Sequence, residues 1–215
     1  LLYGQNLISA DPFNLFRYEK KNFLEMNHES PLAIRPYLDI SKGSKWSIIL
    51  RNELFFSDNY PNLENMGNRW LGKGTGYFTS TNISYINNNF IISIEPYYYN
   101  NQNKYVIDTN RDSPYPNAGP DLFNVLNDKR IHIEDPYVSY GIRESTIFIH
   151  YNQLGLGISN ANMWWGPGIH TSLAMTNNTL GFPYLMIGTI DEKRFDNIGF
   201  NFRYYFSKLN KIYGD

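Results

Sequence analysis

The sequence of 215 residues contains no cysteine. Disulfide frameworks, thiolate zinc sites and cysteine nucleophiles are therefore excluded. No apolar run approaches the ~20 residues that a transmembrane helix needs. A helical membrane protein is thus excluded. A β-barrel membrane protein is still possible, because the apolar residues of its strands alternate with polar ones and form no long apolar run. The sequence also lacks a Gly-x-Ser-x-Gly elbow and a phosphate-binding loop.

Charge is scarce as well. Charged residues make up 18% of the chain, below the typical ~25%, and the net charge is −1. Without a basic field to attract nucleic acid, we expect no nucleic-acid partner. Aromatic residues are instead abundant, with 18 Tyr and 14 Phe. The surface must therefore be made of something other than Lys and Glu.

From residue 32 onward, apolar residues recur with a period of two, which predicts β-strands. The clearest expected strands are 32–40, 47–57, 77–86, 90–99, 145–151, 153–159, 182–190 and 197–207, and roughly nine strands are present by these criteria. Asn87-Asn88-Asn89 predicts a hairpin loop. The stretch 11–29 is the only plausible helix, and 100–130, rich in Pro, Gly and Asn, predicts a long loop.

The two faces of these strands differ in an informative way. In 47–57, Ile48 and Leu50 alternate with Ser47 and Arg51. A soluble β-sandwich also alternates, but its polar face usually carries Lys and Glu, whereas this one carries Ser, Asn, Gly and isolated charges. An apolar face with tyrosines near its ends favours an all-β fold, an antiparallel transmembrane β-barrel with a water-filled lumen. The soluble β-sandwich stays open as an alternative.

The inner faces also indicate the size of the barrel. A barrel of about eight strands is filled by side chains, and the glycines and serines here are too small to fill one. We therefore expect 31–215 to be the N-terminal part of a larger barrel whose closing strands lie outside this sequence. Residues 1–30 are expected to form a separate N-terminal segment. Its start, LLYGQN, fits the remnant of a secretory signal or a trimmed chain, and a short helix follows.

Residues 161–183 read ANMWWGPGIHTSLAMTNNTLGFP. Gly-Pro-Gly cannot continue a helix or a central strand. The block therefore predicts a connection of roughly twenty residues between strands, and this connection could fold into the lumen as a plug. The block resembles the signature of the Wzi-type capsule assembly family, an Asn-x-Trp-Trp-Gly-Pro-Gly turn followed by Ser-Leu-x-x-Ser-Asn-Asn and Gly-Phe-Pro. Thr176 stands where Ser is more usual and keeps the hydroxyl. Residues 69–103 resemble the family's Trp-x-Gly-x-Gly segment, hairpin and Glu-Pro strand end.

This resemblance implies a fold, a cellular location and a role. Members of the family are large β-barrels of the bacterial outer membrane and have no known catalytic function. They act as lectins that help to hold capsular polysaccharide on the cell surface. The implied partners are therefore capsular polysaccharide and outer-membrane lipid. A porin-like diffusion channel, whose lumen passes solutes without holding a sugar, stays open as an alternative.

The candidate residues for polysaccharide binding or for a plug all lie in the Trp-Trp block. They are Asn162, Trp164, Trp165, Asn177 and Asn178. Aromatic faces stack on sugar rings and amides hydrogen-bond to hydroxyls, but tryptophans also anchor barrels at the interface and asparagines also form turns. Gly166, Pro167 and Gly168 are expected to shape the turn itself.

Charged residues form two further groups. Arg51, Glu53, Glu95 and Arg203 fall on the predicted lumen faces, where we expect them to pair and to brace the wall. The second group lies near or in loops and consists of Arg69, Lys73, Lys104 and Arg111. We expect solvent to surround these side chains. The alternative is that they contact an acidic polymer.

Catalysis and metal binding have little support in the sequence. The neighbouring carboxylates Glu134-Asp135 and Asp191-Glu192 do not suit glycoside hydrolysis, which needs two carboxyls about 5–9 Å apart across a substrate. His132, His150 and His170 are too scattered to indicate a metal site. We therefore expect no enzyme, no metal and no cofactor.

Overall fold

A computed structural model describes residues 7–8, 11, 20, 24, 34–35, 37–38, 45–58, 67, 69–105, 135–152, 154–165, 172, 174–175, 177, 181–189, 193–195 and 198–208. Within these ranges the named elements are all β-strands, and the single residues Lys20 and Leu24 are helical. None of the described segments is a helix long and apolar enough to span a membrane. The predicted helix 11–29 and the predicted loop 100–130 lie largely outside the described residues.

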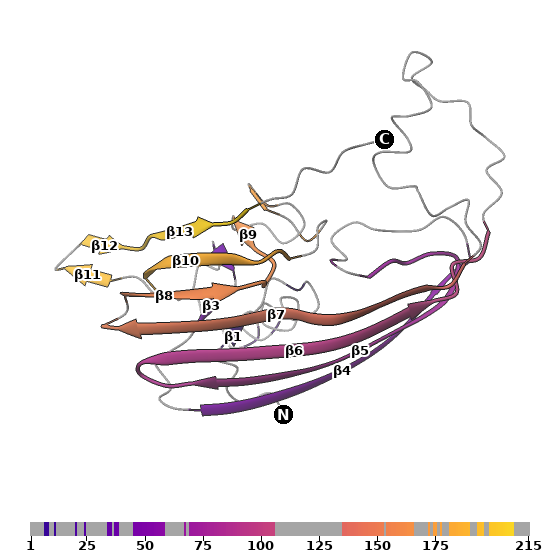
Figure 1. Ribbon diagram of the computed structural model, residues 1–215, viewed down its shortest axis with the longest axis horizontal. Coiled ribbons are helices and arrows are strands. Elements are labelled where there is room, and N and C mark those ends of the chain that lie inside the picture. Colours follow the sequence, from indigo (N-terminus) through magenta and orange to yellow (C-terminus); the bar gives the residue numbers. More distant parts are fainter. Residues whose placement is uncertain are drawn as a thin grey trace, which may run out of the picture.

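Seven strands form one antiparallel sheet in the order β13-β10-β8-β7-β6-β5-β4 (Figure 1). Their bounds are Lys45–Ser57 (β4), Gly74–Ile86 (β5), Phe90–Asn101 (β6), Tyr137–Tyr151 (β7), Leu154–Ser159 (β8), Tyr184–Thr189 (β10) and Arg203–Phe206 (β13). Strands that follow one another along the chain are neighbours in this sheet, as in an up-and-down barrel. The all-β, antiparallel prediction is confirmed, as is the hairpin at Asn87-Asn88-Asn89 between β5 and β6.

One predicted strand, 32–40, does not join the sheet. It is divided into β2 (Ile34–Arg35) and β3 (Tyr37–Leu38). The residue between them is Pro36, which has no backbone N–H with which to continue a ladder. β3 pairs with β1 (Leu7–Ile8), and β2 pairs with β9 (Trp164–Trp165). The prediction of a wall strand at 32–40 was therefore wrong.

The predicted strand 197–207 is also divided. Its first part, β12 (Ile198–Phe200), pairs with β11 (Lys193–Phe195), and its second part, β13, pairs with β10. At the break, the backbone N–H of Phe202 donates to the side-chain hydroxyl of Thr189 at 3.1 Å. The Thr189 hydroxyl thus accepts the hydrogen bond of one backbone N–H, because a hydroxyl competes with backbone carbonyls for it, while the backbone N–H of Thr189 still donates to the carbonyl of Phe202 at 2.9 Å.

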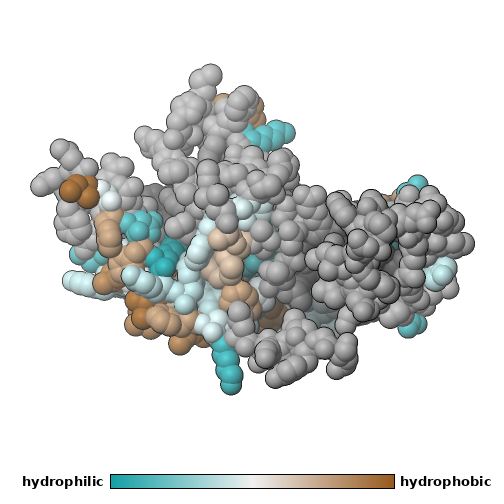
Figure 2. Space-filling model, turned by 90° about the horizontal axis from the view of Figure 1, so that it is seen from above, coloured by the Kyte–Doolittle hydropathy of each residue, from teal (hydrophilic) through white to brown (hydrophobic). Residues whose placement is uncertain are grey.

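The sheet buries its polar face and exposes its apolar face. On β5, Ser80, Asn82 and Ser84 are buried, whereas Ile83 between them is 41% exposed. On β4, Leu50 is 71% and Leu54 is 84% exposed. Figure 2 shows apolar side chains gathered on one flank of the described surface. This is the reverse of a water-soluble protein, in which burial removes apolar groups from water.

Asn52 supports this assignment of faces. The sequence places it on the apolar face of β4 as an exception, and the structure exposes it there. Its Oδ1 accepts hydrogen bonds from the hydroxyls of Tyr77 at 2.9 Å and Thr79 at 3.0 Å. The amide oxygen is therefore satisfied by neighbours on the same face.

The soluble-sandwich alternative predicts that the stripe from Phe200 to Phe206 is buried against a second sheet. Tyr204 is 62% and Phe206 is 56% exposed instead. Among the described residues, no second sheet covers this stripe. The structure therefore does not support a sandwich.

The two rims of the sheet have different connections (Figure 1). At one rim, β5 joins β6 through residues 87–89 and β7 joins β8 through 152–153. At the other rim, the connections are 58–73, 102–136 and 160–183. The Trp-Trp block thus starts from the rim with the long connections. β9, within it, does not join the seven-stranded sheet.

Candidate functional site

A β-bulge places two opposite charges on the inner side of the sheet. The register between β6 and β7 shifts between Ser93 and Glu95, so that Glu95 faces Arg143 while Ser93 faces Thr146. Glu144 in the bulge has a φ of 45°, which is uncommon for a residue other than glycine. A bulge changes which residues of a strand point inward. Arg143 and Glu144 are neighbours in sequence, yet both are largely buried.

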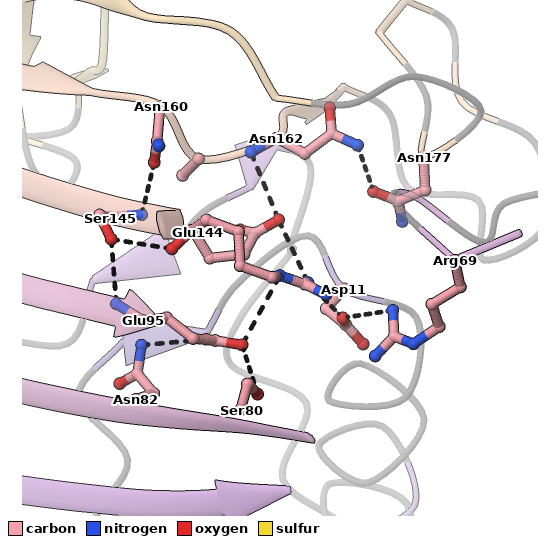
Figure 3. A network of polar contacts seen from close by, with 12 residues as sticks. Asp11, Arg69, Ser80, Asn82, Glu95, Glu144, Ser145, Asn160, Asn162 and Asn177 are labelled. Carbon is pink, nitrogen blue, oxygen red and sulfur yellow. Dashed lines mark hydrogen bonds and ion pairs between the residues drawn. The ribbon is translucent and has the colours of Figure 1, made fainter. Parts of the chain in front are cut away.

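Glu95 is the centre of the hydrogen bonds on this face, as Figure 3 shows. Its side chain is 0% exposed and forms an ion pair with Arg51. Ser80 Oγ donates to Glu95 Oε1 at 2.9 Å, and Asn82 Nδ2 donates to Oε2 at 3.1 Å. Arg143 Nε lies 3.6 Å from Oε1. A fully buried carboxylate is tolerable only with such partners.

Asp11 joins the N-terminal segment to this network (Figure 3). Its Oδ2 accepts from Arg69 Nη1 at 3.1 Å and from Arg143 Nη2 at 2.5 Å. Arg69 also binds Glu53 with two hydrogen bonds, from Nε at 2.6 Å and from Nη2 at 2.8 Å. This two-point geometry is the strong form of an arginine–carboxylate pair. Asp11 thus bridges two arginines that are far apart in sequence.

The electrostatics of Asp11 follow from these contacts. Burial raises the pKa of the Asp11 carboxyl, but the charges of Arg69, Arg143 and Arg51 outweigh burial and hold that pKa well below its usual range. The guanidinium carbon of Arg69 also lies 4.1 Å from the centre of the Phe78 ring, a cation–π contact. Asp11 is therefore ionised at neutral pH.

The predicted lumen charges are partly in this network. Arg51 and Glu95 are buried, and Glu53 pairs with Arg69. Arg203 lies on β13, separated from β6 by three strands of the sheet. The expectation that solvent surrounds Arg69 was wrong, because its side chain is 0% exposed between Asp11 and Glu53. Lys104 is exposed, Lys73 is partly exposed, and Arg111 lies outside the described residues.

Sequence reasoning missed three residues of the network: Asp11, Arg143 and Glu144. Asp11 sits in a stretch without strand periodicity, so nothing local connects it to the sheet. Arg143 and Glu144 precede the expected strand 145–151, and β7 in fact begins at Tyr137. The adjacent opposite charges inside a run of strand-forming residues were the one available signal of a bulge.

The Trp-Trp block packs against the inner face of the sheet. Trp164 is 1% exposed and Trp165 is partly buried. Trp165 forms a β-bridge with Ala174, so the block folds back on itself. A buried apolar cluster lies beneath it, composed of Ile86, Ile91, Phe148, Met163, Tyr184 and Met186, with Trp165 and Tyr205 packed against it. The described residues at the start of this connection therefore pack on the inner face of the sheet.

Two asparagines hold this block together (Figure 3). Asn162 Nδ2 donates to Asn177 Oδ1 at 2.8 Å, and both residues are buried. The backbone carbonyl of Asn177 accepts from Gly67 N at 2.6 Å. The backbone N–H of Asn162 donates to Glu144 Oε1 at 3.4 Å. These bonds connect the block both to the segment before β5 and to the bulge in β7.

Four of the candidate residues, Gly166, Pro167, Gly168 and Asn178, lie outside the described residues. Of the three histidines considered as metal ligands, the structure describes His150 alone. In the part of the chain that is described, no three His, Asp or Glu side chains gather in a way that could hold a metal ion.

A comparison with protein families identifies the chain. The family model described as capsule assembly protein Wzi matches residues 58–211, more than half of the sequence. The chain belongs to the Wzi capsule assembly family. No curated protein and no solved structure matches it. The region matched to the Wzi family begins directly after β4 and includes the rest of the seven-stranded sheet and the whole Trp-Trp block.

Proposed function

We propose that this member of the capsule assembly family is part of an outer-membrane β-barrel. On this proposal it binds capsular polysaccharide, contacts outer-membrane lipid and helps to retain the polymer at the cell surface. Family membership supports the role in capsule assembly. The proposal involves no catalysis and no cofactor. The protein would hold a polymer in place and leave its bonds intact.

The observation that carries this proposal is the inverted sheet. Apolar side chains of β4 and β13, such as Leu50 and Phe206, point outward and are exposed, whereas polar side chains such as Ser80 and Glu95 are buried on the inner face. Lipid outside and polar groups inside are the arrangement of transmembrane barrels. Aromatic residues such as Trp46, 67% exposed at the start of β4, match the girdles found at membrane interfaces.

The proposed orientation follows from the rims. Bacterial barrels have short periplasmic turns and long extracellular loops. The rim with connections 58–73, 102–136 and 160–183 is therefore assigned to the cell exterior. A polymer on the cell surface would then meet the side from which the Trp-Trp block enters the lumen. The buried arginines already have carboxylate partners, so the ion-pair network is assigned to bracing the wall.

The test uses the organism that carries the complete gene. The gene is deleted, and surface polysaccharide is measured separately in cells and in medium. We expect polymer to move from cells to medium while total synthesis is unchanged, with recovery on complementation. Unchanged cell-bound polymer would reject retention. A large ion conductance of the purified protein in planar bilayers would then favour the porin-like alternative.

A further inference from the structure

The two tryptophans of the block differ in their surroundings. Trp164 is 1% exposed and pairs with Arg35 of β2, so it is part of the interior. Trp165 is only partly buried and faces β13, where its ring centre lies 5.6 Å from that of Tyr205. Of these two tryptophans, Trp165 is therefore the one whose ring keeps some accessible surface.

Trp165 belongs to a row of aromatic rings from three segments of the chain. Tyr205 contacts Tyr184 edge to face, with ring centres 5.2 Å apart, and Tyr184 contacts Phe182 at 5.9 Å. The ladder between β10 and β13 places Tyr205 opposite Met186, two residues from Tyr184 on β10. The positions of these rings are thus fixed by the sheet. An aromatic surface built in this way loses little conformational entropy when a ligand stacks on it.

Three of these rings carry buried polar atoms that have no hydrogen-bond partner among the described residues. They are Trp165 Nε1 and the hydroxyl oxygens of Tyr184 and Tyr205. Buried polar groups are nearly always hydrogen-bonded, because leaving one unmatched costs free energy. Of these groups, Trp165 Nε1 and the Tyr205 hydroxyl are neutral donors that lie on neighbouring rings. Neutral donors beside an aromatic face suit hydroxyl and ring oxygens of a sugar better than a carboxylate or a lipid tail.

We infer that Trp165 and Tyr205 form a subsite for a sugar unit of the polysaccharide, with Trp164 as a structural residue beside it. The inference rests on the proposed function and assigns its binding residues. The apolar face of a sugar ring stacks on the Trp165–Tyr205 pair, and sugar oxygens accept hydrogen bonds from Trp165 Nε1 and the Tyr205 hydroxyl. Because both donors are shielded from water in the free protein, binding includes a small movement of the Trp165 and Tyr205 side chains that exposes them.

The test measures binding of the full-length protein in detergent micelles to polysaccharide purified from the culture medium of the same strain. Trp165→Ala is expected to weaken binding by about tenfold or more, as a central aromatic contact does. Tyr205→Phe removes a single hydroxyl and is expected to weaken binding by about fivefold. Trp46→Ala is the matched control, because Trp46 lies on the outer face, and its binding should be unchanged.

Thermal unfolding separates binding from a structural role. Tyr205→Phe deletes an unpartnered hydroxyl, so its melting temperature should be unchanged or higher while its affinity falls. If wild type binds the polymer and both variants bind equally well, the subsite is rejected but retention stands. A lower melting temperature of Tyr205→Phe would show a structural partner for the hydroxyl and would also reject the subsite. If wild type does not bind the polymer, both the subsite and the proposed function fail.

Discussion

Asp11 is the carboxylate that two buried arginines share, at 3.1 Å from Arg69 and 2.5 Å from Arg143. Replacing Asp11 by Asn removes its negative charge, so that less negative charge balances the buried guanidinium groups of Arg69 and Arg143. We expect Asp11→Asn to lower the free energy of unfolding by on the order of 3 kcal/mol. Urea unfolding in micelles would measure this loss. Asp58→Asn, at an exposed position, is the control and should change stability by less than about 0.5 kcal/mol.

The same residue gives a prediction on pH. The pKa of Asp11 is depressed in the folded state by its arginine neighbours, whereas an unfolded Asp has a pKa of about 3.9. Its contribution to stability is therefore complete above the unfolded pKa and is lost as the pH falls from about 4 towards the lower folded-state value. Wild type should lose stability more steeply than Asp11→Asn between about pH 5 and 2. Parallel curves for the two proteins would contradict the assignment.

At the scale of elements, the β5–β6 hairpin depends on one side chain. Asn87 Oδ1 accepts hydrogen bonds from the backbone N–H groups of Asn89 and Phe90, both at 2.8 Å. Asn87→Ala should lower the free energy of unfolding by about 1–2 kcal/mol, because the turn loses these two bonds. Asn88→Ala, at the exposed neighbouring position, should have a much smaller effect. Equal losses from the two variants would show that residue identity in the turn does not matter.

The Trp-Trp block depends on a pair of asparagine side chains that lie 15 residues apart in it. The bond from Asn162 Nδ2 to Asn177 Oδ1 is 2.8 Å long and buried. In a double-mutant cycle, Asn162→Ala and Asn177→Ala should show a coupling energy of about 1 kcal/mol. Each single variant should also make the block more sensitive to protease, because its local stability falls. A cycle between Asn162 and the distant Asn88 should give a coupling near zero.

At the scale of the whole molecule, the outer face distinguishes a membrane protein from a soluble one. Leu50 lies near the middle of β4 and is 71% exposed. In a bilayer, Leu50→Arg should lower the free energy of unfolding by about 2–4 kcal/mol, whereas Thr75→Arg, at the start of β5, should lower it by about 0–1 kcal/mol. Folding into lipid vesicles would measure both. A Leu50→Arg variant as stable as wild type would show that this face meets water.

Much of the sheet could be predicted from the sequence, because strand alternation and hairpin turns are local. Ile48 and Leu50 reveal their face by their spacing, and Asn87-Asn88-Asn89 marks a turn without reference to distant residues. The division of the chain into 1–30 and 31–215 stays a prediction, as does the role of Asn178. The break at Thr189 and Phe202 could not be predicted, because it depends on a side-chain hydroxyl from another strand.

The sequence by itself determined the period of the strands, the polarity of their two faces and, through the Trp-Trp block, the family. Only the tertiary structure decided which charges meet, because Asp11, Arg69 and Arg143 come from three distant parts of the chain. It also decided that Trp164 is interior while Trp165 keeps ring surface beside Tyr205. Two adjacent tryptophans cannot be told apart in the sequence, and their different exposure arises from the residues that pack against each one.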